Sequence, residues 1–102
     1  MWICLNDGFL SIVRKDCKAD ELLVRARRKG DIEKLFPEAT VTVVMHADYR
    51  YRAVVPVEGV IAAISCEIEN IDYPNFKNSV RDEKLHTAYA RVWGTMMYLQ
   101  KP

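Results

Sequence analysis

The order of strands and helices is set by residues 22–71, whose sequence is LLVRARRKGDIEKLFPEATVTVVMHADYRYRAVVPVEGVIAAISCEIENI. Apolar and polar residues alternate over residues 22–27, which predicts a strand. A short helix is expected at residues 31–36, with Asp31 as its N-cap and Pro37 as its stop. The segment therefore begins with a strand followed by a helix.

Two more strands and a longer helix complete this segment. Residues 40–45 are β-branched and apolar, which is typical of a buried strand. Residues 49–55 alternate again, and one face of that strand would carry Tyr49, Tyr51, Ala53 and Val55. Pro56 suits the first turn of a helix, and helical spacing places on one face Val57, Val60, Ile61, Ile64, Ile68 and Ile71. The order β-α-β-β-α is most of a ferredoxin-like unit.

Residues 2–14 predict a β-hairpin that can supply the strand missing from such a unit. Its turn is expected at Asp7-Gly8, a dipeptide that type I′ turns favour. A two-residue loop at this point makes one face of the hairpin aliphatic, through the cross-strand pairs Ile3–Ile12 and Leu5–Leu10. We therefore predict an α+β fold in which a ferredoxin-like-related antiparallel or mixed sheet has helices packed on one face.

An extra helix is expected at the C-terminus, after a loop at residues 72–81. Asp82 can cap it, and its apolar stripe would consist of Leu85, Tyr89, Val92, Trp93, Met96 and Leu99. The preceding helix has small residues opposite its isoleucines, namely Gly59, Ala62, Ala63, Cys66 and Asn70. We expect the last helix to cover this small face. If it packs elsewhere, the small face becomes a candidate interface between two copies of the chain.

The composition fits one domain over residues 1–102, because half of the residues are hydrophobic. Lys and Arg number 15 against 14 Asp and Glu, so the net charge of +1 gives no overall attraction to nucleic acid or membranes. Cys4, Cys17 and Cys66 show no paired spacing, which predicts free thiols. With neither a signal peptide nor an apolar stretch of membrane length, we expect a cytoplasmic protein without a membrane partner.

No catalytic or metal-binding motif is apparent. His46, in a predicted turn, and His86, on the flank of the last helix, lack the third protein ligand that a zinc site needs. Cys66 and His86 could approach each other as nucleophile and base, but nothing near Cys66 in the sequence would activate its thiol. We therefore expect no enzyme, no cofactor and no bound metal.

Two surfaces are candidates for binding. If the strands pair as expected, one sheet face carries Trp2, Phe9, Arg25, Arg27, Arg50 and Arg52. Arginine beside aromatic residues suits phosphate, carboxylate or stacked bases, and the alternative is a solvated face whose arginine stems lie over the sheet. The second candidate combines the small face with loop aromatics that either plug the core or anchor a partner, giving the set Gly59, Ala62, Ala63, Cys66, Tyr73 and Phe76.

Four phrases of the sequence stand out, together with the opening Met1-Trp2-Ile3 and Gly8-Phe9. They are Leu22-Leu23-Val24-Arg25-Ala26-Arg27, Asp48-Tyr49-Arg50-Tyr51-Arg52-Ala53, Ile71-Asp72-Tyr73-Pro74-Asn75-Phe76-Lys77 and Tyr89-Ala90-Arg91-Val92-Trp93. In these phrases the chain resembles a family of small bacterial proteins of unknown function. The resemblance covers most of the chain and implies a bacterial, intracellular protein, but it assigns no catalytic or binding role.

These observations favour a non-enzymatic protein-binding module, of bacterial or mobile-element origin, that acts as an adaptor, regulator or inhibitor. The expected interaction is with a partner protein or with a second copy of the chain. The first alternative is a nucleic-acid-binding domain that uses the arginine face. The second is a small enzyme whose site forms across a dimer.

Overall fold

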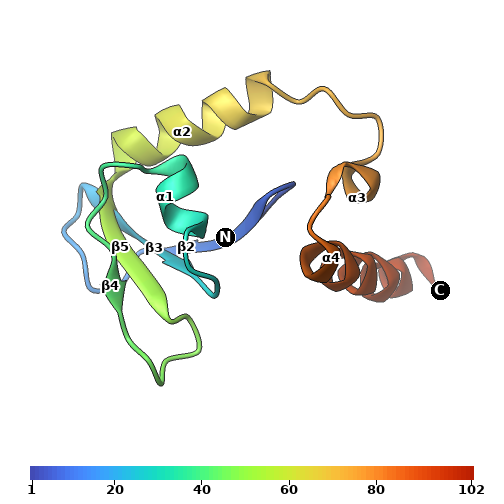
Figure 1. Cartoon of the computed structure of the whole chain (residues 1–102), viewed down its shortest axis with the longest axis horizontal. Coiled ribbons are helices and arrows are strands. Elements are labelled where there is room, and N and C mark those ends of the chain that lie inside the picture. The colour runs from blue at the N-terminus through green and yellow to red at the C-terminus, as the bar shows by residue number, and fades with distance from the viewer.

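A five-stranded antiparallel sheet lies at the centre of the computed structural model, which describes residues 1–102 (Figure 1). The strands, in the spatial order β1-β2-β3-β5-β4, are β1 (Trp2–Leu5), β2 (Gly8–Val13), β3 (Glu21–Ala26), β5 (Tyr51–Pro56) and β4 (Thr42–Val43). The helices are α1 (Asp31–Leu35), α2 (Val57–Glu69), α3 (Phe76–Ser79) and α4 (Glu83–Met96), and α4 continues into the 3-10 turn η1 (Met97–Gln100). The predicted α+β class is confirmed.

The main core lies between one sheet face and the helices α1 and α2. Alternate residues of β2, β3 and β5 point into it, because side chains of a strand alternate between its two faces. They meet Ile32 and Phe36 from the α1 segment and Val60 from α2. The strand residues of this core are Leu10, Ile12, Val24, Ala26, Ala53 and Val55.

The hairpin forms, but its turn lies one residue earlier than predicted. Leu5 pairs with Gly8, so the loop residues are Asn6 and Asp7. Neither residue has a positive φ, and the turn is therefore not type I′. The pairing shifts by two positions, which leaves the same four aliphatic side chains on the core face. Of these, Leu10 and Ile12 are buried, and Ile3 and Leu5 are half-buried.

Gly8 is needed for the close approach of two chain segments and not for the turn. A Cβ atom at Gly8 would lie 3.1 Å from the Asp31 carboxyl group. That carboxylate is buried and accepts a hydrogen bond from the Phe9 backbone N–H at 3.2 Å. Asp31 therefore does not cap α1 through its side chain, as the sequence suggested; Gly30 is the N-cap residue.

The strand expected at residues 40–45 is much shorter than predicted and is not buried. Only Thr42 and Val43 pair with β5, and both are exposed. The reason is position, since β4 is the outer strand of the sheet and neither α1 nor α2 covers it (Figure 1).

The helix α2 is rotated relative to the predicted isoleucine face. Val60, Ala63 and Ile64 pack on the core, whereas Ile61, Ile68 and Ile71 remain more than half exposed. No loop separates β5 from α2, and the Val57 N–H is held by Asp20 O at 2.9 Å. The direction in which the chain leaves β5 therefore determines which side of α2 packs on the core.

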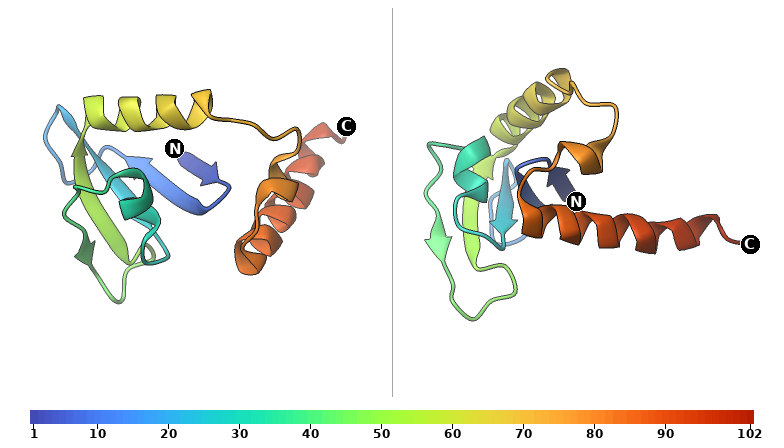
Figure 2. Two further views of the ribbon diagram at one scale, coloured as in Figure 1. Left: turned by 45° about the horizontal axis from the view of Figure 1, so that its top comes forward. Right: turned by 45° about the vertical axis from the view of Figure 1, so that its right-hand side comes forward.

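The last helix does not cover α2. In the views of Figures 1 and 2, α4 lies apart from α2 and stands at the hairpin. Asp82 caps it as predicted, accepting a hydrogen bond from the Leu85 N–H at 2.9 Å. A second cluster of Val80, Leu85 and Tyr89 packs on Phe9, which belongs to the sheet face opposite the main core.

Substitution of Gly8 by Ala tests the close approach. Because the added methyl group crowds a carboxylate held by Phe9, we expect a loss of about 1–3 kcal/mol in the free energy of unfolding, measured by urea denaturation. The matched control is Gly94→Ala, where a Cβ meets nothing within 4 Å; it should stabilise α4 by up to about 1 kcal/mol. In an Asp31→Ala background the cost at Gly8 should shrink, and an unchanged cost would contradict the assignment.

Candidate functional site

The candidate site is built where α4 meets the N-terminal hairpin. The Tyr89 hydroxyl donates a hydrogen bond to Gly8 O at 2.7 Å, and both groups are buried. Arg28 pairs with Asp82 at 2.7 Å and tethers the start of α4 to the end of β3. Burial raises the pKa of Tyr89, which therefore stays a neutral donor. These contacts fix α4 at its first two turns only.

An apolar groove runs between α4 and the outer face of the hairpin. This hairpin groove has a volume of about 380 Å³ and is lined by Trp2, Phe9, Leu85, Ala88 and Val92. Trp2 and Phe9 meet edge to face, with ring centroids 6.3 Å apart. Cationic side chains stand along the groove, namely Arg27, Arg28 and Lys84. The groove thus combines an apolar floor with positive charge.

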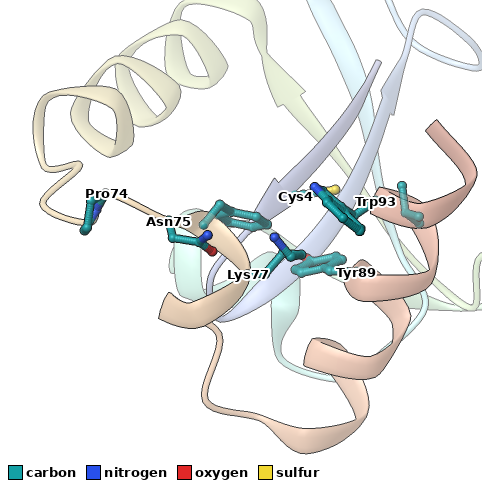
Figure 3. A pocket seen from close by; sticks show the side chains of 8 residues that line it. Cys4, Pro74, Asn75, Lys77, Tyr89 and Trp93 are labelled. Atoms are coloured by element: carbon teal, nitrogen blue, oxygen red, sulfur yellow. The ribbon is translucent and has the colours of Figure 1, made fainter. Parts of the chain in front are cut away.

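A second hollow, of about 420 Å³, lies between α4 and α3 (Figure 3). Figure 3 shows Cys4 from the hairpin, Lys77 from α3 and Trp93 from α4 among its lining residues. The Lys77 ammonium lies 4.6 Å from the centroid of the Trp93 ring, a cation–π distance.

Phe76, the first residue of α3, packs on α4, and Tyr73 in the preceding loop packs on Phe76. Tyr73, Phe76 and Tyr89 form a chain of ring contacts, with centroid distances of 5.7 and 5.3 Å. Phe76 packs on the cluster that includes Val80 and Leu85. Phe76 therefore fills the space beside α4, Tyr73 supports it, and neither joins the small residues of α2 in one surface.

Beyond Tyr89 the helix α4 leaves the body of the molecule. The right-hand view of Figure 2 shows it running away from the sheet toward the C-terminus. We call residues 92–102 the C-terminal arm. Its apolar side chains are each about half exposed or more, and they are Val92, Trp93, Met96, Met97, Tyr98 and Leu99. This stripe continues the wall of the hairpin groove, because Val92 belongs to both.

The arginine face is organised around Tyr49, which was expected on the core face. Tyr49 precedes β5 and is buried on the opposite side, where the guanidinium groups of Arg25 and Arg27 lie 4.5 and 4.3 Å from its ring centroid. Arg25 also sits across from Arg52 in the sheet. Arg50 makes no such contact and is exposed.

The grouped arginines are largely engaged within the chain. Arg25 donates to Ser11 Oγ at 2.8 Å, although its Nε is buried without a partner. Arg27 donates to Asp48 O at 2.9 Å, and Arg52 donates to Tyr49 O at 3.1 Å. These contacts support the loop before β5, so the face is less available to a ligand than its composition suggested.

The small residues of α2 do not form one open patch. Gly59 and Ala63 are half-buried beside Phe36, whereas Ala62 and Cys66 are exposed. The uncovered apolar surface of α2 is formed instead by Ile61 and Ile68, and Ile71 extends it just after the helix. The acidic residues of the same segment are Glu58, Glu67, Glu69 and Asp72. We call these seven residues the acidic isoleucine face.

The histidines and cysteines make no hydrogen bond to one another. No three His, Cys, Asp or Glu side chains come together in a way that could hold a metal ion. The Cys66 sulfur accepts a hydrogen bond from Asn70 and makes none with His86, and His46 is exposed. Burial raises the pKa of the Cys4 thiol, which disfavours a thiolate nucleophile.

Comparison of the chain with protein-family models, with curated proteins and with solved structures finds no match. None of the helices combines the length and the apolar composition needed to cross a membrane.

Replacing Tyr89 by Phe tests the anchor of α4. The variant leaves Gly8 O without its donor, so we expect a loss of about 1–3 kcal/mol in unfolding free energy at neutral pH. Because burial raises the folded-state pKa of Tyr89 above its ordinary value of 10.0, the unfolded chain loses this proton first. Wild-type stability should therefore fall as the pH rises past about 10, and the Phe variant should lose less.

Urea denaturation at pH 7 and at about pH 10.5 measures both effects. The control is Tyr98→Phe, since Tyr98 is exposed; this variant should follow the wild type at both values of pH. Equal alkaline losses for the wild type and Tyr89→Phe would contradict the role assigned to Tyr89.

Proposed function

We propose that this chain is a non-enzymatic protein-binding module, an adaptor, regulator or inhibitor, that takes up an acidic amphipathic segment on α4. One observation carries the proposal: the apolar stripe of α4 runs on from the hairpin groove into an uncovered C-terminal arm. Monomeric proteins rarely leave so continuous an apolar surface facing water.

The chemistry of this surface supports a protein ligand. Aromatic residues, Met and Arg are enriched at protein interfaces, and Trp is frequent among the residues that contribute most to affinity. The surface presents Trp2 and Trp93, the only tryptophans of the chain, together with Met96 and Met97.

Its charge supports an acidic ligand. After Glu83 the sequence contains no Asp or Glu, whereas it contains Lys84, Arg91 and Lys101. Lys84 stands on the hairpin groove beside Arg27 and Arg28. Arg28 is paired with Asp82, and the acidic residue that lines the groove, Asp31, is buried and bound to the Phe9 N–H. An acidic segment would therefore meet net positive charge along the groove.

The two alternatives fit less well. Three of the four arginines proposed for nucleic acid bind Tyr49, Asp48 or Ser11 of the same chain. An enzyme needs a nucleophile or base within reach of a partner group, and Cys66 and His86 are not hydrogen-bonded to each other.

The proposal extends to fold type and origin. The sheet order β2-β3-β5-β4 has the pattern of a ferredoxin-like sheet in which β2 takes the place of the last strand. We infer a permuted relative of that fold. A bacterial or mobile-element origin rests on the sequence resemblance alone.

Tryptophan fluorescence tests the proposed function directly, because both tryptophans lie on the surface concerned. We expect a synthetic amphipathic helix with Glu on its polar side to shift the emission to the blue. The same peptide with Lys in place of Glu should bind more weakly. About 0.5 M salt should reduce the difference between the two, since exposed charges are then screened.

Two variants localise the binding. Lys84→Glu should weaken the binding of the acidic peptide. Arg50→Ala, which changes an exposed arginine away from the groove, should leave this binding unchanged. Equal binding of the two peptides, or no binding of either at a concentration where the chain is monomeric, would refute the proposal. Tight, salt-sensitive binding of RNA or DNA that is lost in Arg50→Ala would favour the nucleic-acid alternative.

A further inference from the structure

We propose that the segment bound by α4 is the acidic isoleucine face of α2 in a second copy of this chain. The inference rests on the proposed function and names the ligand of that surface. It starts from two uncovered apolar faces on separate helices, one on α4 and one on α2 (Figure 1). A third exposed apolar run, Val43 to Met45, lies at the edge strand β4 and provides the control position.

The face on α2 is incomplete within one chain. Ile61, Ile68 and Ile71 are 59%, 62% and 53% exposed. The second half of α2 also stands off from the edge strand β1, leaving a hollow of about 180 Å³ lined by Ile3, Leu5, Ile64, Ile68, Ile71 and Tyr73 among others. Ile3 and Leu5, which the sequence placed in the core, are only half-buried for the same reason. A partner helix laid here would complete the burial of the five aliphatic residues that line the hollow.

The two faces are opposite in charge. Residues 57–73 contain four acidic residues, Glu58, Glu67, Glu69 and Asp72, and no Lys or Arg, which gives −4. Residues 84–102 contain three basic residues, Lys84, Arg91 and Lys101, and no Asp or Glu, which gives +3. Complementary potentials of this kind favour the unlike pair and disfavour each like pair.

The chain cannot bring its own two faces together in this fold. Tyr89 is bonded to Gly8 and Asp82 to Arg28, so α4 is held at the hairpin. In the views of Figures 1 and 2, α4 stays apart from α2. The matching face must therefore come from another molecule. Because every copy carries both faces, two copies can exchange the contact reciprocally about a two-fold axis.

The test measures self-association of the full chain by light scattering after gel filtration. We expect the molar mass of a dimer at low salt, and a decrease toward the mass of a monomer at high salt. Ile68→Glu on α2 and Met96→Glu on α4 should each weaken the dimer by about 10–100-fold. Both positions are exposed in one chain, so the thermal midpoint of the resulting monomer should stay near that of a diluted wild type. The control is Val43→Glu on the β4 edge, which should leave the dimer intact.

A cross-linking experiment identifies the surfaces. Carbodiimide treatment of a mixture of unlabelled and ¹⁵N-labelled chains should join Lys84 or Lys101 of one copy to Glu67 or Glu69 of the other. If Ile68→Glu fails to fold, the reversal of both Glu67 and Glu69 to Lys provides the same test without adding a charge at an apolar position.

Three results would overturn the inference. They are a monomeric wild type, a dimer that survives both the Ile68→Glu variant and the charge reversal, and a dimer that Val43→Glu dissociates. In the first case, an acidic peptide that still binds the monomer would leave the proposed function standing. A monomer that binds no peptide would refute both proposals.

Discussion

The hydrogen bond from Tyr89 to the Gly8 carbonyl determines how the C-terminal third of the chain is placed. At the same turn, the lack of a side chain at Gly8 lets the Asp31 carboxylate approach and accept a hydrogen bond from the Phe9 N–H. The hairpin is thereby locked between α1 on one side and α4 on the other. Everything C-terminal to α2 follows from this anchor: α4 packs on Phe9, the hairpin groove forms beside it, and α2 is left without a covering helix.

The cost of this arrangement is apolar surface left in water. The radius of gyration is 14.6 Å, compared with about 13 Å for a compact domain of this length. Only 17 of the 102 residues are buried. A single chain therefore leaves many of its hydrophobic side chains in contact with water. The large apolar residues left exposed are not scattered, since most of them belong to the hairpin start, to α2 and the residues just after it, and to α4 and the C-terminal arm. A binding partner for these faces is the simplest physical account of why the sequence keeps them apolar.

Local pattern was sufficient where neighbours along the chain decide the outcome. The alternation at Leu22 to Arg27 and the Asp82 cap depend on adjacent residues, and both were predicted. The hairpin turn, the α2 rotation and the placement of Tyr49 depend on distant contacts: with Asp31, with Asp20 and with Arg25 and Arg27. Of the predicted surface, Trp2, Phe9 and Arg27 line the groove, whereas Lys84 was missed. The absence of acidic residues after Glu83 was the available signal for its role.

The opposite charges of the two faces also limit which apolar surfaces of this chain can pair with each other. Apolar contact is non-directional, so exposed isoleucines on α2 would by themselves join any apolar surface, including another α2. Two α2 faces, however, bring eight carboxylates together, twice the four of each copy, and two arms bring together only cations. Like charges at short range disfavour both pairings, while the unlike pairing loses little. The apolar residues therefore supply the affinity, and the charges restrict it to one kind of contact.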